Sequence, residues 1–100
     1  MKFKFCFSIL LSAICLNVSA QQEDYLITGT YTSGKSEGIY VYKFNSSNGT
    51  TTAISKVKIS NPSFLAVSPD EQFVFAVQEN AAAKGKGGEI TAFSFNKKNG

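Results

Sequence analysis

A block of eleven residues occurs twice in this chain, and its spacing restricts the folds that the chain can adopt. Residues 39–49 (IYVYKFNSSNG) and 90–100 (ITAFSFNKKNG) share Ile, Phe, Asn, Asn and Gly at matching positions, and the second block begins 51 residues after the first. Upstream, residues 25–28 (YLIT) align with 73–76 (FVFA) at an offset of 48. A period near 50 built from short antiparallel strands is typical of β-propeller blades. Two unrelated hairpins with similar turns are the alternative.

The pattern of apolar residues predicts an all-β fold. Short runs rich in β-branched and aromatic residues are separated by loops rich in Gly, Asn, Ser and Pro. The predicted strands are residues 25–30, 39–44, 51–59, 64–67, 73–77 and 90–95. Asn-Gly at residues 48–49 and the sequence Ser-Pro-Asp-Glu at 68–71 predict tight turns, the second of type I.

Alternation along two strands predicts which side chains share a face. In residues 39–44 the aromatic side chains lie on one face, and Ile39 and Val41 lie on the other. In residues 51–59 we expect Ala53, Ser55, Val57 and Ile59 to lie opposite Ile54, Lys56 and Lys58. Several strands are apolar on both faces, and a chain this small buries only about 60% of its unfolded surface. We therefore expect the N-terminal part of a longer propeller, with roughly the first one to two blades.

The first twenty residues have the pattern of an export signal. Lys2 and Lys4 precede an apolar run of about a dozen residues, and small residues lead to a cleavage site between Ala20 and Gln21. The run is shorter than the roughly 20 residues that span a bilayer, although an uncleaved anchor or a buried helix is the alternative. Ile14 before Cys15 argues against lipidation. The prediction is a periplasmic or secreted protein without a stable membrane span after cleavage.

The composition of residues 21–100 excludes several functions for this segment. It contains eight Lys against seven Asp and Glu, and it lacks Cys, His, Arg and Trp. The weak net charge argues against nucleic acid as a partner. Without Cys and His there is no disulfide framework, no Cys/His metal site and no Ser-His-Asp catalysis. We expect neither a metal nor a cofactor, and any principal catalytic residues should follow Gly100.

Residues 29–36 (GTYTSGKS) match the fixed positions of a phosphate-binding loop, G-x-x-x-x-G-K-[ST]. Such a loop needs a helix directly after it, because the helix N-terminus contributes the N–H groups that hold the phosphates. Here Gly38 and an alternating strand pattern follow instead. We therefore predict a hairpin loop, and no nucleotide as a partner, despite the match from Gly29 to Ser36.

Four segments, in this order, resemble the start of a known family. They are residues 25–32 (YLITGTYT), 38–42 (GIYVY), 61–70 (NPSFLAVSPD) and 73–79 (FVFAVQE). The chain is similar to the lactonase family, seven-bladed propellers related to bacterial 6-phosphogluconolactonase and fungal carboxymuconate lactonizing enzyme. It departs from the family pattern at Glu71, where Gly is usual, and at Gln78, where Asn is usual. The resemblance implies that residues 21–100 form the N-terminal part of such a propeller.

The resemblance also implies hydrolysis of a sugar lactone, with 6-phosphogluconolactone as the named substrate. Water would attack the ester carbonyl and yield the aldonic acid. Export favours an unphosphorylated lactone, because phosphorylated sugar intermediates are cytoplasmic. The alternatives are a non-enzymatic exported propeller that binds carbohydrate or protein in the cell envelope, and an exported β-sandwich adhesin domain.

Four residues at strand ends are candidates for the site. Glu79 follows an apolar strand and is the candidate catalytic residue, since propellers gather functional side chains at strand ends around the channel. Thr30 and Tyr31 end the first strand, and Asn61 precedes Pro62; these three are candidates for substrate binding. Ordinary loop and turn roles are the alternative for all four. Lys84 and Lys86 belong to a solvated loop or, alternatively, to a lid that attracts anions.

Overall fold

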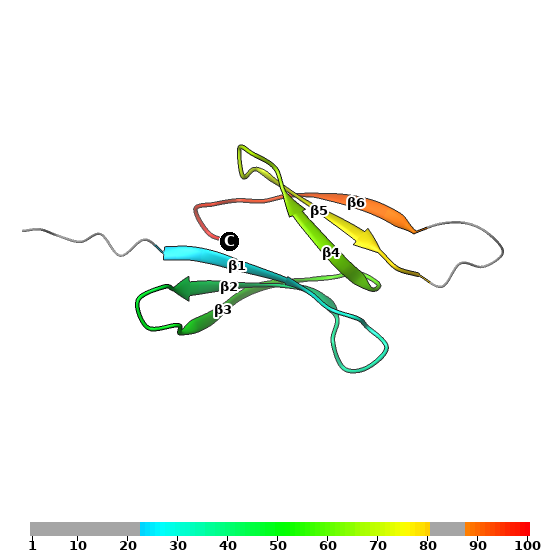
Figure 1. The fold of residues 1–100 in the computed structure, drawn as a ribbon, viewed down its shortest axis with the longest axis horizontal. Coiled ribbons are helices and arrows are strands. Elements are labelled where there is room, and N and C mark those ends of the chain that lie inside the picture. Colours follow the sequence, from blue (N-terminus) through cyan, green and yellow to red (C-terminus); the bar gives the residue numbers. More distant parts are fainter. Residues whose placement is uncertain (1–22, 81–87) are drawn as a thin grey trace, which may run out of the picture.

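The computed structural model describes residues 23–80 and 88–100, and this part of the chain consists of strands and loops (Figure 1). The strands are β1 (Glu23–Gly29), β2 (Gly38–Asn45), β3 (Thr51–Lys58), β4 (Pro62–Val67), β5 (Phe73–Gln78) and β6 (Glu89–Ser94). The predicted all-β class and all six predicted strands are confirmed. The predicted export signal lies outside the described residues, as do Lys84 and Lys86.

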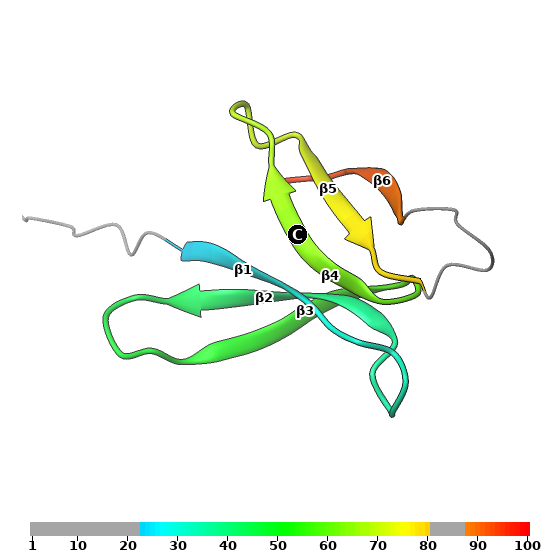
Figure 2. The same ribbon diagram turned by 45° about the vertical axis from the view of Figure 1, so that its right-hand side comes forward.

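The strands form two antiparallel sheets of three, ordered β1-β2-β3 and β4-β5-β6. Figures 1 and 2 show β1 and β4 at an angle to each other where the two sheets meet. The sequence repeat aligns β5 with β1 and β6 with β2. In that alignment β4 has no counterpart in the first sheet, and β3 has none in the second. Each sheet is therefore a partial blade.

The turns that follow β2 and β6 show that the repeat extends to the backbone. The Gly49 N–H donates to the Asn45 carbonyl at 2.8 Å, and the Gly100 N–H donates to the Asn96 carbonyl at 2.7 Å. In both turns the Asn Oδ1 accepts the N–H two residues onward at 2.9 Å. The glycine φ values are 74° and 73°, in the left-handed region that glycine adopts without penalty. Shared sequence thus gives shared geometry.

The core lies between the central strands of the two sheets. Ile39 and Val41 on β2 and Val74 and Ala76 on β5 are buried. A space of about 270 Å³ between the sheets is lined from both sides, for example by Ile39 and Val74. The predicted division of β2 is confirmed, since its aliphatic residues face this core. The outer face of the second sheet is exposed: Phe64 is 67% and Ile90 is 73% accessible.

The expected alternation of residues 51–59 is wrong at two positions, Ala53 and Ile54. Val41 pairs with Ser55, but the next residue, Tyr42, pairs with Ala53, so that Ile54 is the extra residue of a β-bulge. A bulge reverses the facing of the residues beyond it. Ile54 turns toward the C-terminal turn, where a Cβ on Gly100 would lie 3.0 Å from its Cγ2 atom. Local periodicity carries no sign of this contact between the sheets.

The two sheets approach most closely where β1 ends and β4 begins. A Cβ atom on Gly29 would lie 2.1 Å from the carbonyl oxygen of Pro62, and the Pro62 side chain is fully buried. Only a residue without a side chain fits at this crossing. The first glycine of the phosphate-loop-like motif therefore has a packing role, and the crossing holds the following residues, Thr30 to Thr32, beside the start of β4.

Candidate functional site

Three of the four predicted site residues meet beside this crossing. Tyr31 follows β1, Asn61 precedes β4, and Glu79 follows β5, so the three come from different strand ends at the right-hand side of the sheets in Figure 1. The Tyr31 hydroxyl donates a hydrogen bond of 2.7 Å to Glu79 Oε2. This bond joins residues 48 positions apart and links the first sheet to the second.

Asn61 connects both sides of the cluster. Its Oδ1 accepts from the Thr32 backbone N–H at 2.8 Å and from the Thr32 hydroxyl at 3.0 Å. Its own N–H donates to Thr32 Oγ1 at 3.2 Å. Toward the second sheet, its Nδ2 donates to the Glu79 carbonyl at 3.4 Å, and its carbonyl accepts the Glu79 N–H at 3.0 Å. Thr32, which sequence reasoning missed, is thus part of the cluster.

The Tyr31–Glu79 contact sets the charge state of both groups. The Tyr31 hydrogen bond, with a smaller effect from the Ser63 hydroxyl, holds the pKa of Glu79 below its ordinary value. The same hydrogen bond and the negative charge of Glu79 raise the pKa of Tyr31. At neutral pH the pair is therefore a carboxylate beside an intact phenol. The carboxylate accepts hydrogen bonds and the phenol donates one.

Ser63 is a second residue that sequence reasoning missed. It is the extra residue of a bulge in β4, because Pro62 pairs with Gln78 and Phe64 with Val77. Its hydroxyl oxygen is buried, and within residues 23–80 and 88–100 it has no partner at good hydrogen-bond geometry. It nevertheless lies close enough to lower the pKa of the Glu79 carboxyl. Bulges often re-aim side chains beside functional sites, and residue periodicity does not reveal them.

The fourth predicted residue, Thr30, does not join the cluster. Its hydroxyl donates to the Gly38 carbonyl at 2.7 Å. This bond joins the two ends of the loop between β1 and β2. The segment after Ser36 is strand β2, as predicted, and no helix begins there. Thr32 lies inside the phosphate-loop-like motif, and its backbone N–H donates to Asn61 Oδ1. The motif therefore serves the contact between the sheets.

The family assignment rests on most of the chain. The family described as "Lactonase, 7-bladed beta-propeller" matches residues 25–100. The chain belongs to this lactonase family. Its two sheets are accordingly parts of blades of a seven-bladed β-propeller, which confirms the predicted architecture. No curated protein matches the sequence significantly.

Solved structures resemble this lactonase segment closely. A candidate 6-phosphogluconolactonase from Bacteroides fragilis NCTC 9343 is 38% identical over 78% of the chain, with a TM-score of 0.71. A second, from Bacteroides uniformis ATCC 8492, is 36% identical over 80%, with a TM-score of 0.73. A periplasmic gluconolactonase from Pseudomonas aeruginosa is 40% identical over 72%, with a TM-score of 0.64. The segment spans 21–22% of the length of these proteins.

The two departures from the lactonase pattern have structural explanations. Gln78 is only 8% accessible, and its Nε2 donates to Thr91 Oγ1 at 2.9 Å on the neighbouring strand β6. Its amide is therefore held within the second sheet. Glu71 adopts a φ of 58°, a conformation that favours glycine. Its N–H donates to the Ser68 carbonyl at 2.8 Å, the bond expected for the predicted turn.

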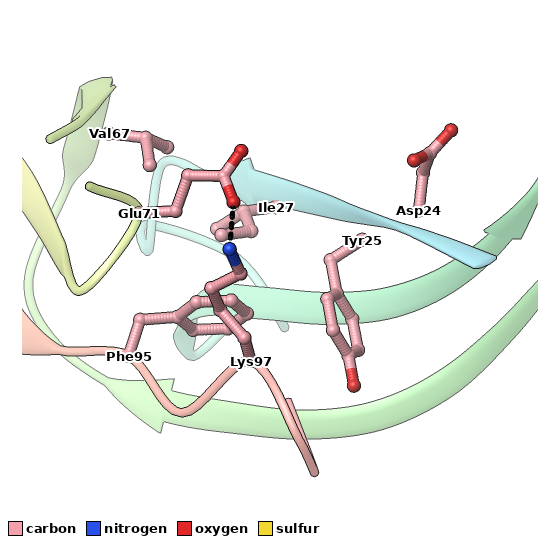
Figure 3. A pocket seen from close by; sticks show the side chains of 7 residues that line it. All are labelled: Asp24, Tyr25, Ile27, Val67, Glu71, Phe95 and Lys97. Atoms are coloured by element: carbon pink, nitrogen blue, oxygen red, sulfur yellow. Dashed lines mark ion pairs between the residues drawn. The ribbon is translucent and has the colours of Figure 1, made fainter. Parts of the chain in front are cut away.

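Figure 3 shows a cleft of about 550 Å³. It is lined from β1 and from the ends of β4 and β6, so it lies at the opposite strand ends from the cluster. Glu71 and Lys97 form an ion pair of 2.5 Å across it, and the Tyr25 and Phe95 rings meet edge to face at 5.3 Å. None of the predicted site residues lines this cleft.

Within the described ranges no three His, Cys, Asp or Glu side chains gather as metal ligands. The same part of the chain contains no helix that is long and apolar enough to span a membrane.

Proposed function

We propose that the full-length protein is a lactone hydrolase that opens an unphosphorylated sugar lactone to its aldonic acid. In this reaction a water oxygen bonds to the ester carbonyl carbon and the ring C–O bond breaks. The former ring oxygen takes up a proton and becomes a hydroxyl. Membership of the lactonase family and the names of the similar structures support the reaction class.

The observation that carries the proposal is the Tyr31–Glu79 pair. The Tyr31 hydroxyl donates its one proton to Glu79 at 2.7 Å, so its oxygen and the remaining acceptor sites of the Glu79 carboxylate can both accept hydrogen bonds from neighbouring hydroxyl groups of a sugar. Glu79 is a poor match for a general base near neutral pH, because a base works best when its pKa is close to the working pH, and the Tyr31 bond lowers the pKa of Glu79. We assign Glu79 to substrate binding and the base to residues beyond this segment.

The charge of the cluster supports the unphosphorylated substrate. A site for a phosphate needs a cationic partner, whereas the described residues of the cluster supply one carboxylate and no cation. The negative Glu79 would repel a phosphate placed beside it. The competing hypothesis is that Lys84 and Lys86 attract a phosphorylated lactone.

Export supports the same choice. The predicted export signal in residues 1–20 would place the protein outside the cytoplasm. One of the similar structures is a periplasmic gluconolactonase. A periplasmic location is therefore part of the proposal.

The test is turnover of glucono-δ-lactone and of its 6-phosphate by the full-length mature protein, after subtraction of spontaneous hydrolysis. The proposal expects a higher kcat/KM for the unphosphorylated lactone. A preference for the phosphate ester would overturn the substrate assignment and direct attention to Lys84 and Lys86. If neither lactone is turned over while a carbohydrate binds, the non-enzymatic alternative holds instead.

A further inference from the structure

Asn61 was expected to contact substrate, but its contacts indicate a different role. We propose that Asn61 is a positioning residue that holds the Tyr31–Glu79 pair together across two blades. This positioning role follows from the contacts of Asn61 alone. Its consequence for turnover rests on the proposed lactone hydrolysis.

The polar groups of Asn61 are largely occupied by the protein itself. The two lone pairs of Oδ1 accept the Thr32 N–H and the Thr32 hydroxyl, at 2.8 and 3.0 Å. One proton of Nδ2 goes to the Glu79 carbonyl, and the Asn61 N–H and carbonyl are also used. Only the second Nδ2 proton is left for a ligand among the described contacts. A side chain so engaged is suited to hold other residues in place.

The bonds of Asn61 close a ring around the Tyr31–Glu79 contact. Thr32 is bonded to Asn61, Asn61 is bonded to the main chain of Glu79, and the Glu79 carboxylate accepts the Tyr31 hydroxyl. The Tyr31–Thr32 peptide bond completes the ring. Both residues of the pair are therefore fixed at their main chains through one shared neighbour. Loss of the Asn61 carboxamide removes its bonds to Thr32 and to the Glu79 carbonyl, and with them part of this ring.

The backbone of Asn61 explains why this residue type is suited to the position. Its φ of 44° lies in the left-handed region, which Asn tolerates better than other residues with a side chain. The following Pro62 is buried against the β1–β4 crossing. Glycine adopts the same φ without penalty. Asn61→Gly therefore removes the carboxamide and leaves the backbone conformation accessible.

Thr30 provides a matched control. It lies one residue before Tyr31, and its hydroxyl also makes a hydrogen bond of 2.7 Å, but to the carbonyl of Gly38 within the first sheet. Thr30→Val removes one hydrogen bond near the cluster without touching the ring. A general effect of lost polar contacts would appear in both variants. An effect of positioning would appear in Asn61→Gly alone.

The experiment measures the ionisation of Tyr31 in the full-length mature protein. Tyrosine is replaced with 3-fluorotyrosine, and the Tyr31 resonance is assigned by its absence in the Tyr31→Phe variant and followed by ¹⁹F NMR against pH. In Asn61→Gly the Tyr31 pKa should fall, because the phenol loses its fixed place beside the Glu79 carboxylate. Thr30→Val should leave it unchanged. With glucono-δ-lactone, kcat/KM should fall about tenfold in Asn61→Gly, because the Tyr31–Glu79 pair is no longer held in place for the substrate.

Thr32→Val adds a second variant that removes the bonds between the Thr32 hydroxyl and Asn61 without adding a charge. It should keep the bond from the Thr32 N–H to Asn61 Oδ1 and give an intermediate Tyr31 pKa, and it provides the test if Asn61→Gly fails to fold. An unchanged Tyr31 titration in both Asn61→Gly and Thr32→Val would overturn the positioning role. If the wild-type protein turns over no lactone, the proposed function fails, while the titration still decides the role of Asn61.

Discussion

Two residues with side chains adopt left-handed backbone conformations within the described ranges, and they lie at opposite ends of the sheets. Asn61, with φ 44°, lies in the candidate site, and Glu71, with φ 58°, lies beside the cleft of Figure 3. Asn61 is held by bonds that reach two sheets. Glu71 is held within the second sheet only, by the Ser68 carbonyl in the β4–β5 turn and by an exposed ion pair with Lys97 after β6. An unfavourable conformation that is fixed from several directions indicates function more strongly than one that a turn alone explains.

The largest expected effect concerns the crossing that supports the site end. In Gly29→Ala the new Cβ would lie 2.1 Å from the Pro62 carbonyl oxygen, so the sheets must move apart. We expect the full-length protein to lose about 2–3 kcal/mol of unfolding free energy, as is usual for overpacking. Gly34→Ala, in the same motif, is the control, because nothing lies within 4 Å of its Cβ position. Equal urea midpoints for the two variants would show that the crossing is not a tight contact.

The next effect compares the two left-handed residues directly by changing each to glycine. Asn61→Gly relieves backbone strain but loses several hydrogen bonds, and should lower the unfolding free energy by about 1–2 kcal/mol. Glu71→Gly relieves the same strain and loses only an exposed ion pair. It should raise the unfolding free energy by about 0.5–1 kcal/mol. Urea denaturation of both full-length variants tests the prediction, and changes of the same sign would contradict the distinction between the two ends.

A smaller effect is expected in the acid dependence of stability. Because the Tyr31 bond lowers the pKa of Glu79 from 4.5, this pair stabilises the folded state above that pH. The contribution is lost as the pH falls through the lowered value. In Tyr31→Phe the Glu79 pKa should rise and the stability should depend less steeply on pH below 4.5. Carboxylate ¹³C NMR measures the pKa directly, and an unchanged Glu79 titration would mean that the hydrogen bond is absent in solution.

The smallest effect on stability is expected from the loss of an exposed ion pair at the same end of the sheets as the candidate site. Lys56 and Glu37 form an ion pair in which both side chains are well exposed. The pair lowers the pKa of Glu37 and raises that of Lys56, but solvent and salt screen such contacts. Lys56→Gln should therefore leave the thermal midpoint unchanged within error at physiological salt. A clear loss of stability would show that this end is held by charge as well as by the Asn61 bonds.

Local patterns were sufficient to predict the strands. Alternation placed Ile39 and Val41 on the buried face of β2, and Asn-Gly at residues 48–49 predicted the turn that follows β2. The same logic failed at Ile54, the extra residue of β3, which lies beside the C-terminal turn. Such a bulge depends on contacts distant in sequence, so residue periodicity carries no sign of it.

The candidate site was predictable in part. The strand-end argument selected Tyr31, Asn61 and Glu79, which the structure brings together, and also Thr30, whose hydroxyl bonds elsewhere. Thr32 and Ser63 were missed because their roles depend on a partner in the other sheet and on a bulge. The position of a residue at a strand end can be read from sequence. The partner that its side chain finds depends on how the two sheets meet.

The most direct test of the account compares Glu79→Gln with Glu71→Gln in the full-length mature protein. Both residues are exposed carboxylates, but they lie at opposite ends of β5. Glu79 directly follows this strand, and Glu71 lies in the turn before it. The measurement is kcat/KM for glucono-δ-lactone, corrected for spontaneous hydrolysis. We expect kcat/KM to fall at least about tenfold for Glu79→Gln, since a charged hydrogen-bond acceptor for the substrate is lost. We expect wild-type turnover for Glu71→Gln. Wild-type turnover in both variants would contradict the assignment of the site to Glu79.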